Sequence, residues 1–198
     1  MVFSSALPKE GKTTTVANLA VSFSQLSEKV LVIDSDLRRP RLHRIFKARN
    51  STGLSGYLTG KVSLEEAIQK TSVDNVWILP SGLIPPYPAE LLNSKKMREM
   101  LQELKSSFDF ILLDTTPVLG VIDAVIVSSM VDSAVLVIKA GETVKKPFLN
   151  AVGELRKTNT KILGVVFNYL KVSKGDYSFM DYYRYYRHYY TEAGESEK

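Results

Sequence analysis

The sequence contains no cysteine among its 198 residues, which excludes disulfide bonds, thiolate metal sites and cysteine nucleophiles. It also lacks an apolar run of the roughly 18 residues that a membrane-spanning helix needs, and its first residues show no signal-peptide pattern. These absences predict a soluble chain and agree with a cytosolic setting.

The composition is that of an ordinary globular domain, with 44% hydrophobic and 24% charged residues. A chain of this length can bury one sizeable core. The formal net charge of +5 is modest. Because most surplus lysine and arginine side chains simply solvate a surface, we expect no nucleic-acid partner from charge alone.

Short apolar runs alternate with helical patterns along the chain. Continuous apolar runs are typical of strands buried on both faces of a parallel sheet. Helical spacing is expected at residues 12–26, 89–105 and 144–157, with shorter helices at 41–46 and 63–70. The pattern therefore predicts an α/β fold, a doubly wound, mostly parallel sheet flanked by helices. The expected strands are residues 1–5 and the runs "KVLVIDSD", "NVWILP", "FDFILLD", "SAVLVIKA" and "KILGVVFNYL".

The composition changes after residue 170, where aliphatic residues become rare and the chain ends in charged residues. We therefore expect a catalytic domain at residues 1–170 and a flexible C-terminal tail at residues 171–198.

The stretch "SSALPKEGKTTT" places a tight loop between the first expected strand and a helix. Backbone N–H groups at such a junction point at an anion, and the helix dipole favours its charge. The lysine reaches the terminal phosphates and the following threonine suits Mg²⁺. Alanine at position 6 replaces the usual first glycine. Taken alone, the loop is also compatible with a helix start that binds no ligand. The expected nucleotide-binding residues here are Pro8, Lys9, Glu10, Gly11, Lys12, Thr13 and Thr14.

Three carboxylates follow apolar strands and strengthen the nucleotide prediction. Asp34 and Asp36 end "LVIDSD", and Asp114 ends "FILLD". Ligands of open α/β sheets bind at these carboxyl ends. Mg²⁺ prefers oxygen ligands, so we expect Thr13, Asp36 and Asp114 to hold it, directly or through water. Asp34 remains to accept a proton from an attacking hydroxyl.

Asn168 ends another apolar strand and has both a donor and an acceptor, which suits an adenine edge. As a turn residue it is equally ordinary.

Seven of the ten tyrosines lie in the last 22 residues. Three interpretations compete. Tyr182, Tyr186 and Tyr189 share one face of an amphipathic docking helix, the tyrosines stack with Arg184 and Arg187 on single-stranded nucleic acid, or they are phosphate acceptors. Each phosphate adds about −1.5 to −2 charges, so several of them convert the segment into a polyanion. The tyrosines are Tyr177, Tyr182, Tyr183, Tyr185, Tyr186, Tyr189 and Tyr190.

Taken together, these motifs resemble those of the bacterial tyrosine kinases, the tyrosine autokinases of capsule and exopolysaccharide export. "ALPKEGKTTT" resembles their Walker A loop, "LVIDSDLRRP" their second acidic motif and "ILLDTTP" their Walker B motif. "PSGLIPPYPAELLNS" resembles their proline-rich segment, and the end of the chain resembles their tyrosine cluster. Related partitioning and division-site ATPases carry a signature lysine where this chain has Leu7.

The resemblance implies a sheet of the P-loop NTPase type and a kinase that transfers the γ-phosphate of ATP to C-terminal tyrosines of a neighbouring subunit. It implies the roles that charge suggests: Lys12 on the phosphates, Thr13, Asp36 and Asp114 on Mg²⁺, and Asp34 on the tyrosine hydroxyl. It further implies a ring of identical subunits, a membrane-spanning polysaccharide co-polymerase as activator, a cognate tyrosine phosphatase, and a cytoplasmic location at the inner face of the membrane.

Two departures and two alternatives accompany this resemblance. Family kinases usually have, upstream of the loop, a helix with an acidic-and-arginine motif, whereas this sequence begins at the first expected strand. Tyr87 stands where the proline-rich segment usually has asparagine. The alternative functions are a non-kinase ATPase switch and a nucleic-acid-binding protein. The basic run "LRRPRLHRIFKAR" is either an interaction face or a solvated helix.

Overall fold

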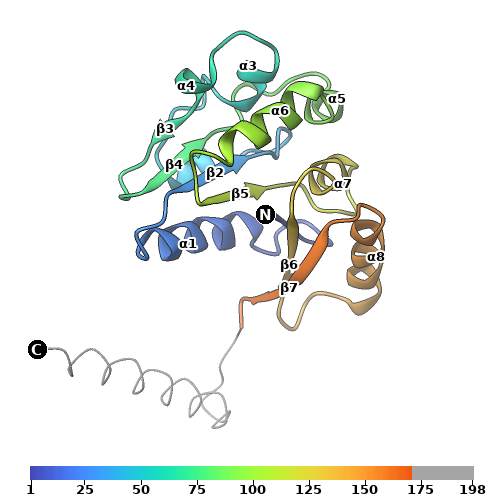
Figure 1. The fold of residues 1–198 in the computed structure, drawn as a ribbon. Coiled ribbons are helices and arrows are strands. Elements are labelled where there is room, and N and C mark those ends of the chain that lie inside the picture. Colours follow the sequence, from blue (N-terminus) through green and yellow to red (C-terminus); the bar gives the residue numbers. More distant parts are fainter. Residues whose placement is uncertain (171–198) are drawn as a thin grey trace, which may run out of the picture. The chain divides into compact units, whose positions relative to one another are not determined.

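The structure is a computed structural model that describes residues 1–170. The chain divides into two units, Met1–Asn168 and Tyr169–Lys198, and all the helices and strands given below belong to the first (Figure 1). Within the described residues, no helix combines the length and the apolarity needed to cross a bilayer.

Residues 1–170 form seven strands and eight helices. The strands are β1 (Val2–Ser4), β2 (Val30–Asp34), β3 (Gln69–Lys70), β4 (Val76–Leu79), β5 (Phe110–Asp114), β6 (Ser133–Lys139) and β7 (Lys161–Asn168). The helices are α1 (Lys12–Ser24), α2 (Leu42–Ile45), α3 (Leu54–Leu58), α4 (Leu64–Ala67), α5 (Pro88–Leu92), α6 (Lys95–Leu104), α7 (Asp123–Ser128) and α8 (Lys145–Arg156).

The strands form a single sheet in the order β3-β4-β2-β5-β1-β6-β7. All neighbouring strands are parallel except β3, which pairs antiparallel with β4 at one edge. The predicted α/β class with a doubly wound, mostly parallel sheet is therefore confirmed. Because the six other strands are parallel, their carboxyl ends lie along one edge of the sheet, where ligands of such folds bind.

Each face of the sheet has its own hydrophobic core, because successive side chains of a strand point to opposite faces. Leu31 and Ile33 of β2 face the core that α3 to α8 cover. Val30 and Val32 pack instead with α1 and α2. In Figure 1 α1 accordingly lies on one side of the sheet, and α5, α6 and α7 lie on the other. β2 is buried along its whole length, as its continuous apolar run predicts.

Three expectations about individual elements are wrong. The helix expected at residues 89–105 is two helices, because the Ser94 hydroxyl accepts a hydrogen bond from the Met97 amide and starts α6 as a new helix. The helix expected at 63–70 ends at Ala67, and β3 follows. β7 is an edge strand rather than a doubly buried one, with Leu163 and Phe167 exposed. Helices α3 and α7 were not expected.

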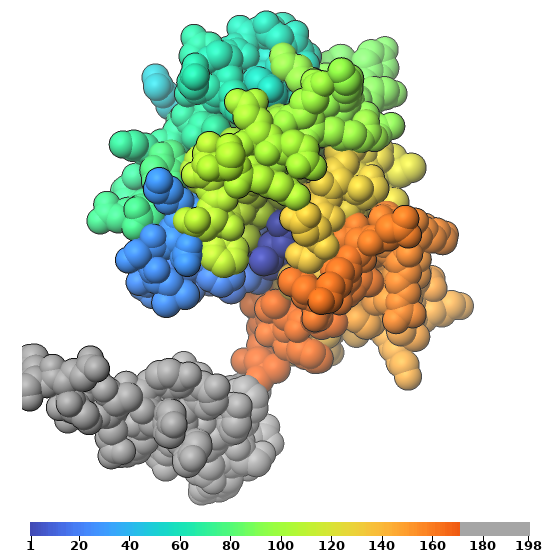
Figure 2. Space-filling model, in the orientation of Figure 1, coloured from blue at the N-terminus to red at the C-terminus, as the bar shows by residue number. Residues whose placement is uncertain are grey.

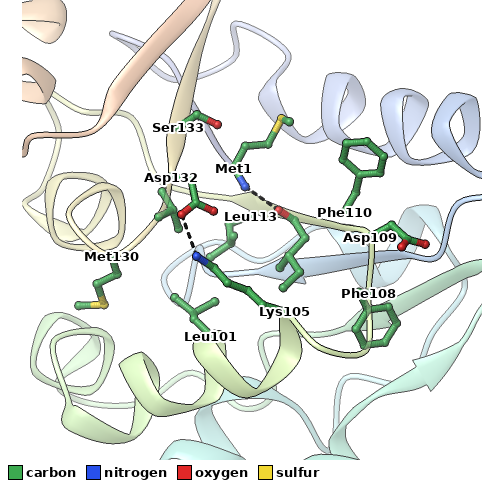
Figure 3. A pocket seen from close by; sticks show the side chains of 12 residues that line it. Met1, Leu101, Lys105, Phe108, Asp109, Phe110, Leu113, Met130, Asp132 and Ser133 are labelled. Atoms are coloured by element: carbon green, nitrogen blue, oxygen red, sulfur yellow. Dashed lines mark hydrogen bonds and ion pairs between the residues drawn. The ribbon is translucent and has the colours of Figure 1, made fainter.

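A hollow of about 350 Å³ lies at the amino ends of β1, β5 and β6, beside the last turn of α6. In Figure 2 the dark-blue start of the chain is visible at its base, between the green and yellow segments. Figure 3 shows its interior, where the Met1 amine donates to the Ile111 carbonyl over 2.7 Å and Lys105 pairs with Asp132. The hollow lies at the end of the strands opposite the expected nucleotide site.

Candidate active site

The phosphate loop, residues 5–11, connects β1 to α1 at the carboxyl edge of the sheet. Two of its residues are left-handed, Lys9 at φ 67° and Gly11 at φ 96°. Gly11 caps α1, and glycine takes this backbone conformation without the strain of a side chain. Lys12 and Thr13 therefore begin the helix, where backbone N–H groups have no partner within the helix. This is the arrangement that binds phosphate at a helix N-terminus.

Lys12 is held inside this loop. Its side chain is buried, and its Nζ donates to Ser5 Oγ over 3.0 Å. Burial lowers the pKa of Lys12, while the charges of Asp114 and Asp36 oppose that shift. The lysine is thus a desolvated cation placed between the loop and two of the expected carboxylates.

Asp114 ends β5 beside β1 and is 2% exposed. Burial raises its pKa to about 7, and a hydrogen bond from the Thr13 hydroxyl together with the charge of Lys12 opposes the shift. Its Oδ1 is buried and has no hydrogen-bond partner among the described residues. The structure therefore brings Thr13, Lys12 and Asp114 together, and it leaves one carboxylate oxygen without a protein partner.

Asp34 and Asp36 differ in how they are held. Asp34 is fully buried, and its Oδ2 accepts the amides of Arg41 and Leu42, each over 3.0 Å. Its Oδ1 is buried without a partner. Burial and the nearby Asp114 raise the pKa of Asp34 well above its usual value, although the two backbone hydrogen bonds oppose this. Asp36 is partly exposed and its Oδ1 accepts the amides of Arg38 and Arg39.

Glu10 and Asn168 make contacts that sequence reasoning did not anticipate. The Glu10 carboxylate is 4% exposed, accepts the Leu7 amide over 2.9 Å and accepts the hydroxyl of Thr143. Asn168 Nδ2 donates to the Glu10 carbonyl over 3.2 Å. The Glu10 side chain thus holds the phosphate loop against the segment after β6, and Asn168 lies beside the same loop at the end of β7.

The residues present fit a nucleotide with Mg²⁺. Among the described residues, two buried carboxylate oxygens lack a hydrogen-bond partner. Together with the buried Lys12 at a helix N-terminus, they suit phosphates and a hard cation. Within residues 1–170, no three carboxylate, histidine or cysteine side chains gather closely enough to hold a metal. A cation here would need phosphate oxygens and water besides Thr13 and the carboxylates, which agrees with the usual preference of Mg²⁺ to keep several waters.

The remaining expected residues are placed as follows. Pro8, Lys9 and Thr14 are exposed at the loop and the first turn of α1. The seven expected phosphoacceptors, Tyr177 to Tyr190, lie outside the described residues. Asp123, which pairs with Arg38, was missed because one aspartate at a helix start cannot be distinguished in sequence from a cap. Thr143 gave no signal, since its partner Glu10 is 133 positions away. Ser5 gave none because a serine in a loop is ordinary, although its partner Lys12 is only seven positions away.

A mostly parallel sheet with a phosphate loop and acidic strand ends at one edge defines a nucleotide-binding protein of the P-loop NTPase type. The profile of the AAA-domain family matches residues 9–164. The septum site-determining protein MinD from Pyrococcus horikoshii, solved with Mg-ADP, superposes with a TM-score of 0.75. It is 29% identical, over 87% of this chain and 71% of that one.

The tyrosine kinases are closer in sequence. Tyrosine-protein kinase YwqD of Bacillus subtilis is 44% identical over 174 residues, which cover 88% of this chain and 73% of YwqD. The kinase domain of the Escherichia coli tyrosine kinase ETK superposes with a TM-score of 0.84 at 34% identity, over 89% of this chain and 69% of that domain. The chain belongs to the bacterial tyrosine-kinase family, as its motifs indicate.

Proposed function

We propose that this chain is an ATP-dependent protein-tyrosine autokinase that phosphorylates its C-terminal tyrosine cluster in trans. The observation that carries the proposal is the desolvated Lys12 in the phosphate loop, facing Asp114 and Asp36. A buried cation with acidic partners at a helix N-terminus is suited to a chain of phosphates and their metal. Family membership supports tyrosine as the acceptor.

The reaction forms a bond between the tyrosine oxygen and the γ-phosphorus of ATP. The bond from that phosphorus to the β–γ bridging oxygen breaks, and ADP leaves with the electron pair. Thr13, Asp36 and Asp114 would hold Mg²⁺, which would supply neutralisation of the phosphate charge. Lys12 stabilises the charge that develops on the transferred group, and the loop amides fix its position.

Asp34 is the proposed acceptor of the tyrosine proton. Its raised pKa makes it a stronger base than an ordinary aspartate. Its carboxylate is fully buried in the structure. The residues that cover Oδ1 must therefore move before the tyrosine hydroxyl can reach that oxygen. Asp36 lies two residues further along and is partly exposed, which suits a metal ligand that exchanges water.

The proposed biological role is control of capsular or exopolysaccharide polymerisation and export. The proposed partners are a membrane-spanning polysaccharide co-polymerase that activates the kinase, neighbouring copies in a ring, and a cognate tyrosine phosphatase. Through its activator the chain works at the cytoplasmic face of the membrane. The family supports this assignment, and no nucleic-acid partner is proposed.

Mass spectrometry of the purified protein after incubation with ATP and Mg²⁺ tests the proposal. We expect phosphate on residues between Tyr177 and Tyr190, and at least a hundredfold less in Lys12→Met. Lys61→Met removes an exposed lysine in the turn after α3 and is the matched control. Undiminished phosphotyrosine in Lys12→Met contradicts the assigned site.

A non-kinase ATPase switch is the alternative that this experiment also tests. It predicts release of inorganic phosphate from ATP without phosphotyrosine, both alone and after the cytoplasmic segment of the co-polymerase is added.

Replacing the seven C-terminal tyrosines with phenylalanine tests whether these residues accept phosphate or help to bind ATP. We expect ATP affinity to be unchanged in that variant while phosphorylation is lost.

A further inference from the structure

A second hollow, of about 640 Å³, opens beside the active site. The segment that carries Asp34 and Asp36 onward into α2 forms one wall, and the segment after β4 forms the other. Four arginines line it: Arg38, Arg39, Arg41 and Arg44. We refer to this feature as the basic hollow.

The charge of the basic hollow is largely uncompensated. Arg38 pairs with Asp123, whereas Arg39, Arg41 and Arg44 take part in none of the ion pairs among residues 1–170. Among residues 1–170, no acidic side chain lines the hollow. His43, another lining residue, has a buried Nδ1 without a hydrogen-bond partner. Clustered guanidinium groups without carboxylate partners are suited to an anion that binds two or more of them.

The opposite wall is apolar and firmly built. Leu83 and Ile84 are 70% and 65% exposed, so their side chains are available to a ligand. Asn50 holds this wall by donating to the Gly82 carbonyl over 3.0 Å and accepting the Gly82 amide over 3.1 Å. The Ser55 hydroxyl donates to the Leu83 carbonyl over 2.7 Å. A ligand with an apolar body and an anionic tip therefore has a surface for each part.

The basic hollow adjoins the expected catalytic carboxylates. Asp34 accepts the Arg41 amide, and Asp36 accepts the amides of Arg38 and Arg39, so the arginine segment is folded around both aspartates. The charge of Arg41 also acts on Lys12 and Asp114. A group bound in the hollow is thus a neighbour of the group that reacts.

We propose that the basic hollow binds a phosphotyrosine side chain of the acceptor segment and so presents a neighbouring tyrosine to the active site. Phosphotyrosine combines an aromatic ring with a tip of about −1.5 to −2 charges. The chain supplies such pairs, since Tyr182, Tyr183, Tyr185 and Tyr186 lie one to four residues apart. An extended segment advances roughly 3.3 Å per residue, which keeps the next tyrosine close. Each phosphorylation then favours the following one.

This inference rests on the proposed function for its source of phosphotyrosine, but a binding experiment tests it without catalysis. The probes are peptides of residues 180–191, one unmodified and one with phosphate on Tyr186, added to the full chain after phosphatase treatment and without ATP. We expect the phosphopeptide to bind at least tenfold more tightly, with a preference that weakens as salt rises. The double variant Arg39→Gln/Arg44→Gln should lose that preference.

A matched double variant controls for net charge. Lys29→Gln/Lys161→Gln removes two exposed lysines at the amino ends of β2 and β7, and it should keep the preference. Equal binding of the two peptides, or an unchanged preference in the arginine variant, overturns the proposal. So does tighter, arginine-dependent binding of a single-stranded oligonucleotide or of phosphatidylserine vesicles than of the phosphopeptide.

A time course with ATP then tests the consequence. In Arg39→Gln/Arg44→Gln we expect the first phosphate to appear at the normal rate and the multiply phosphorylated forms several-fold more slowly. Equal rates for all forms contradict stepwise presentation. If no phosphotyrosine forms in any variant even after the cytoplasmic segment of the co-polymerase is added, the proposed kinase function fails, whereas the peptide-binding result still decides the function of the hollow.

Discussion

The guanidinium of Arg38 forms a two-point ion pair with the carboxylate of Asp123, through Nε at 2.7 Å and a second nitrogen at 3.1 Å. The contact joins the segment after Asp36 to the first residue of α7, 85 positions away. The Asp123 side chain is 1% exposed, whereas that of Arg38 is 40% exposed. Arg38 therefore neutralises a buried carboxylate and holds the acidic segment against the helix that follows β5.

Replacing Arg38 with methionine should lower the free energy of unfolding by about 1–3 kcal/mol, because it leaves a buried acceptor without its partner. Urea unfolding measures the change. Arg38→Met/Asp123→Asn should cost less than the sum of the two single variants, since the second change removes the orphaned charge. Additive effects would show that the ion pair contributes nothing to stability.

Asp114→Asn should stabilise the protein in the absence of nucleotide and metal while abolishing phosphorylation. Burial raises the pKa of Asp114 from 3.8 to about 7, so between these pH values the folded state holds a proton that the unfolded state has lost. Stability therefore falls as pH rises from about 4 to 7 and stays lower above that. Because an amide does not ionise, the variant should lack this part of the slope and gain on the order of 2–4 kcal/mol at pH 8.

Thermal unfolding in EDTA at pH 4.5 and pH 8 measures this effect. Asp109→Asn, at an exposed aspartate just before β5, is the control and should show the parent slope. A variant that is less stable than the parent at pH 8 would show that burial of the Asp114 carboxylate does not destabilise the protein.

The sequence predicted the parts of the site that follow local patterns. Asp34 and Asp114 each end an apolar run, and their strands pair so that these two residues are partners in register. The pair Gly11 and Lys12 predicts the start of α1 locally, since a glycine before a helix favours the left-handed cap that the structure has. Those predictions needed only the rule that parallel strands end at one edge.

Features that depend on partners distant in sequence could not be predicted. The break between α5 and α6 lies at Asn93 and Ser94, neither of which forbids a helix, and only the Ser94 cap reveals it. Glu10 appears in sequence as a residue facing phosphate, but its carboxylate turns inward to Thr143, 133 positions away. The strand order also had no sequence signal, because parallel neighbours are set by crossovers rather than by the strands.

The contact between Glu10 and Thr143 indicates that Thr143 positions the phosphate loop without touching the nucleotide. Thr143→Val keeps the shape of the side chain but removes the hydroxyl, so the buried Glu10 carboxylate loses a donor. We expect a loss of about 1–2 kcal/mol of stability and a several-fold weaker ATP affinity by calorimetry.

Thr59→Val is the matched control, because the Thr59 hydroxyl bonds only to carbonyls of α3, away from the loop. It should leave ATP affinity unchanged. If Thr143→Val binds ATP as tightly as the parent, Glu10 does not hold the loop through this contact.

An alanine substitution at Gly82 tests how rigid the apolar wall of the basic hollow is. Its φ of +76° is left-handed, and a Cβ there would lie 2.6 Å from the Ser55 hydroxyl and 3.3 Å from the Gly53 amide nitrogen. Gly141 has almost the same φ, +75°, but a Cβ there meets nothing within 4 Å. Both Gly→Ala changes carry the backbone strain of roughly 1–2 kcal/mol, and only Gly82→Ala adds the clash. Chemical unfolding should therefore show Gly82→Ala to be the less stable variant by at least 1 kcal/mol. Equal losses of unfolding free energy in the two variants would mean that the wall accommodates the added methyl group without cost.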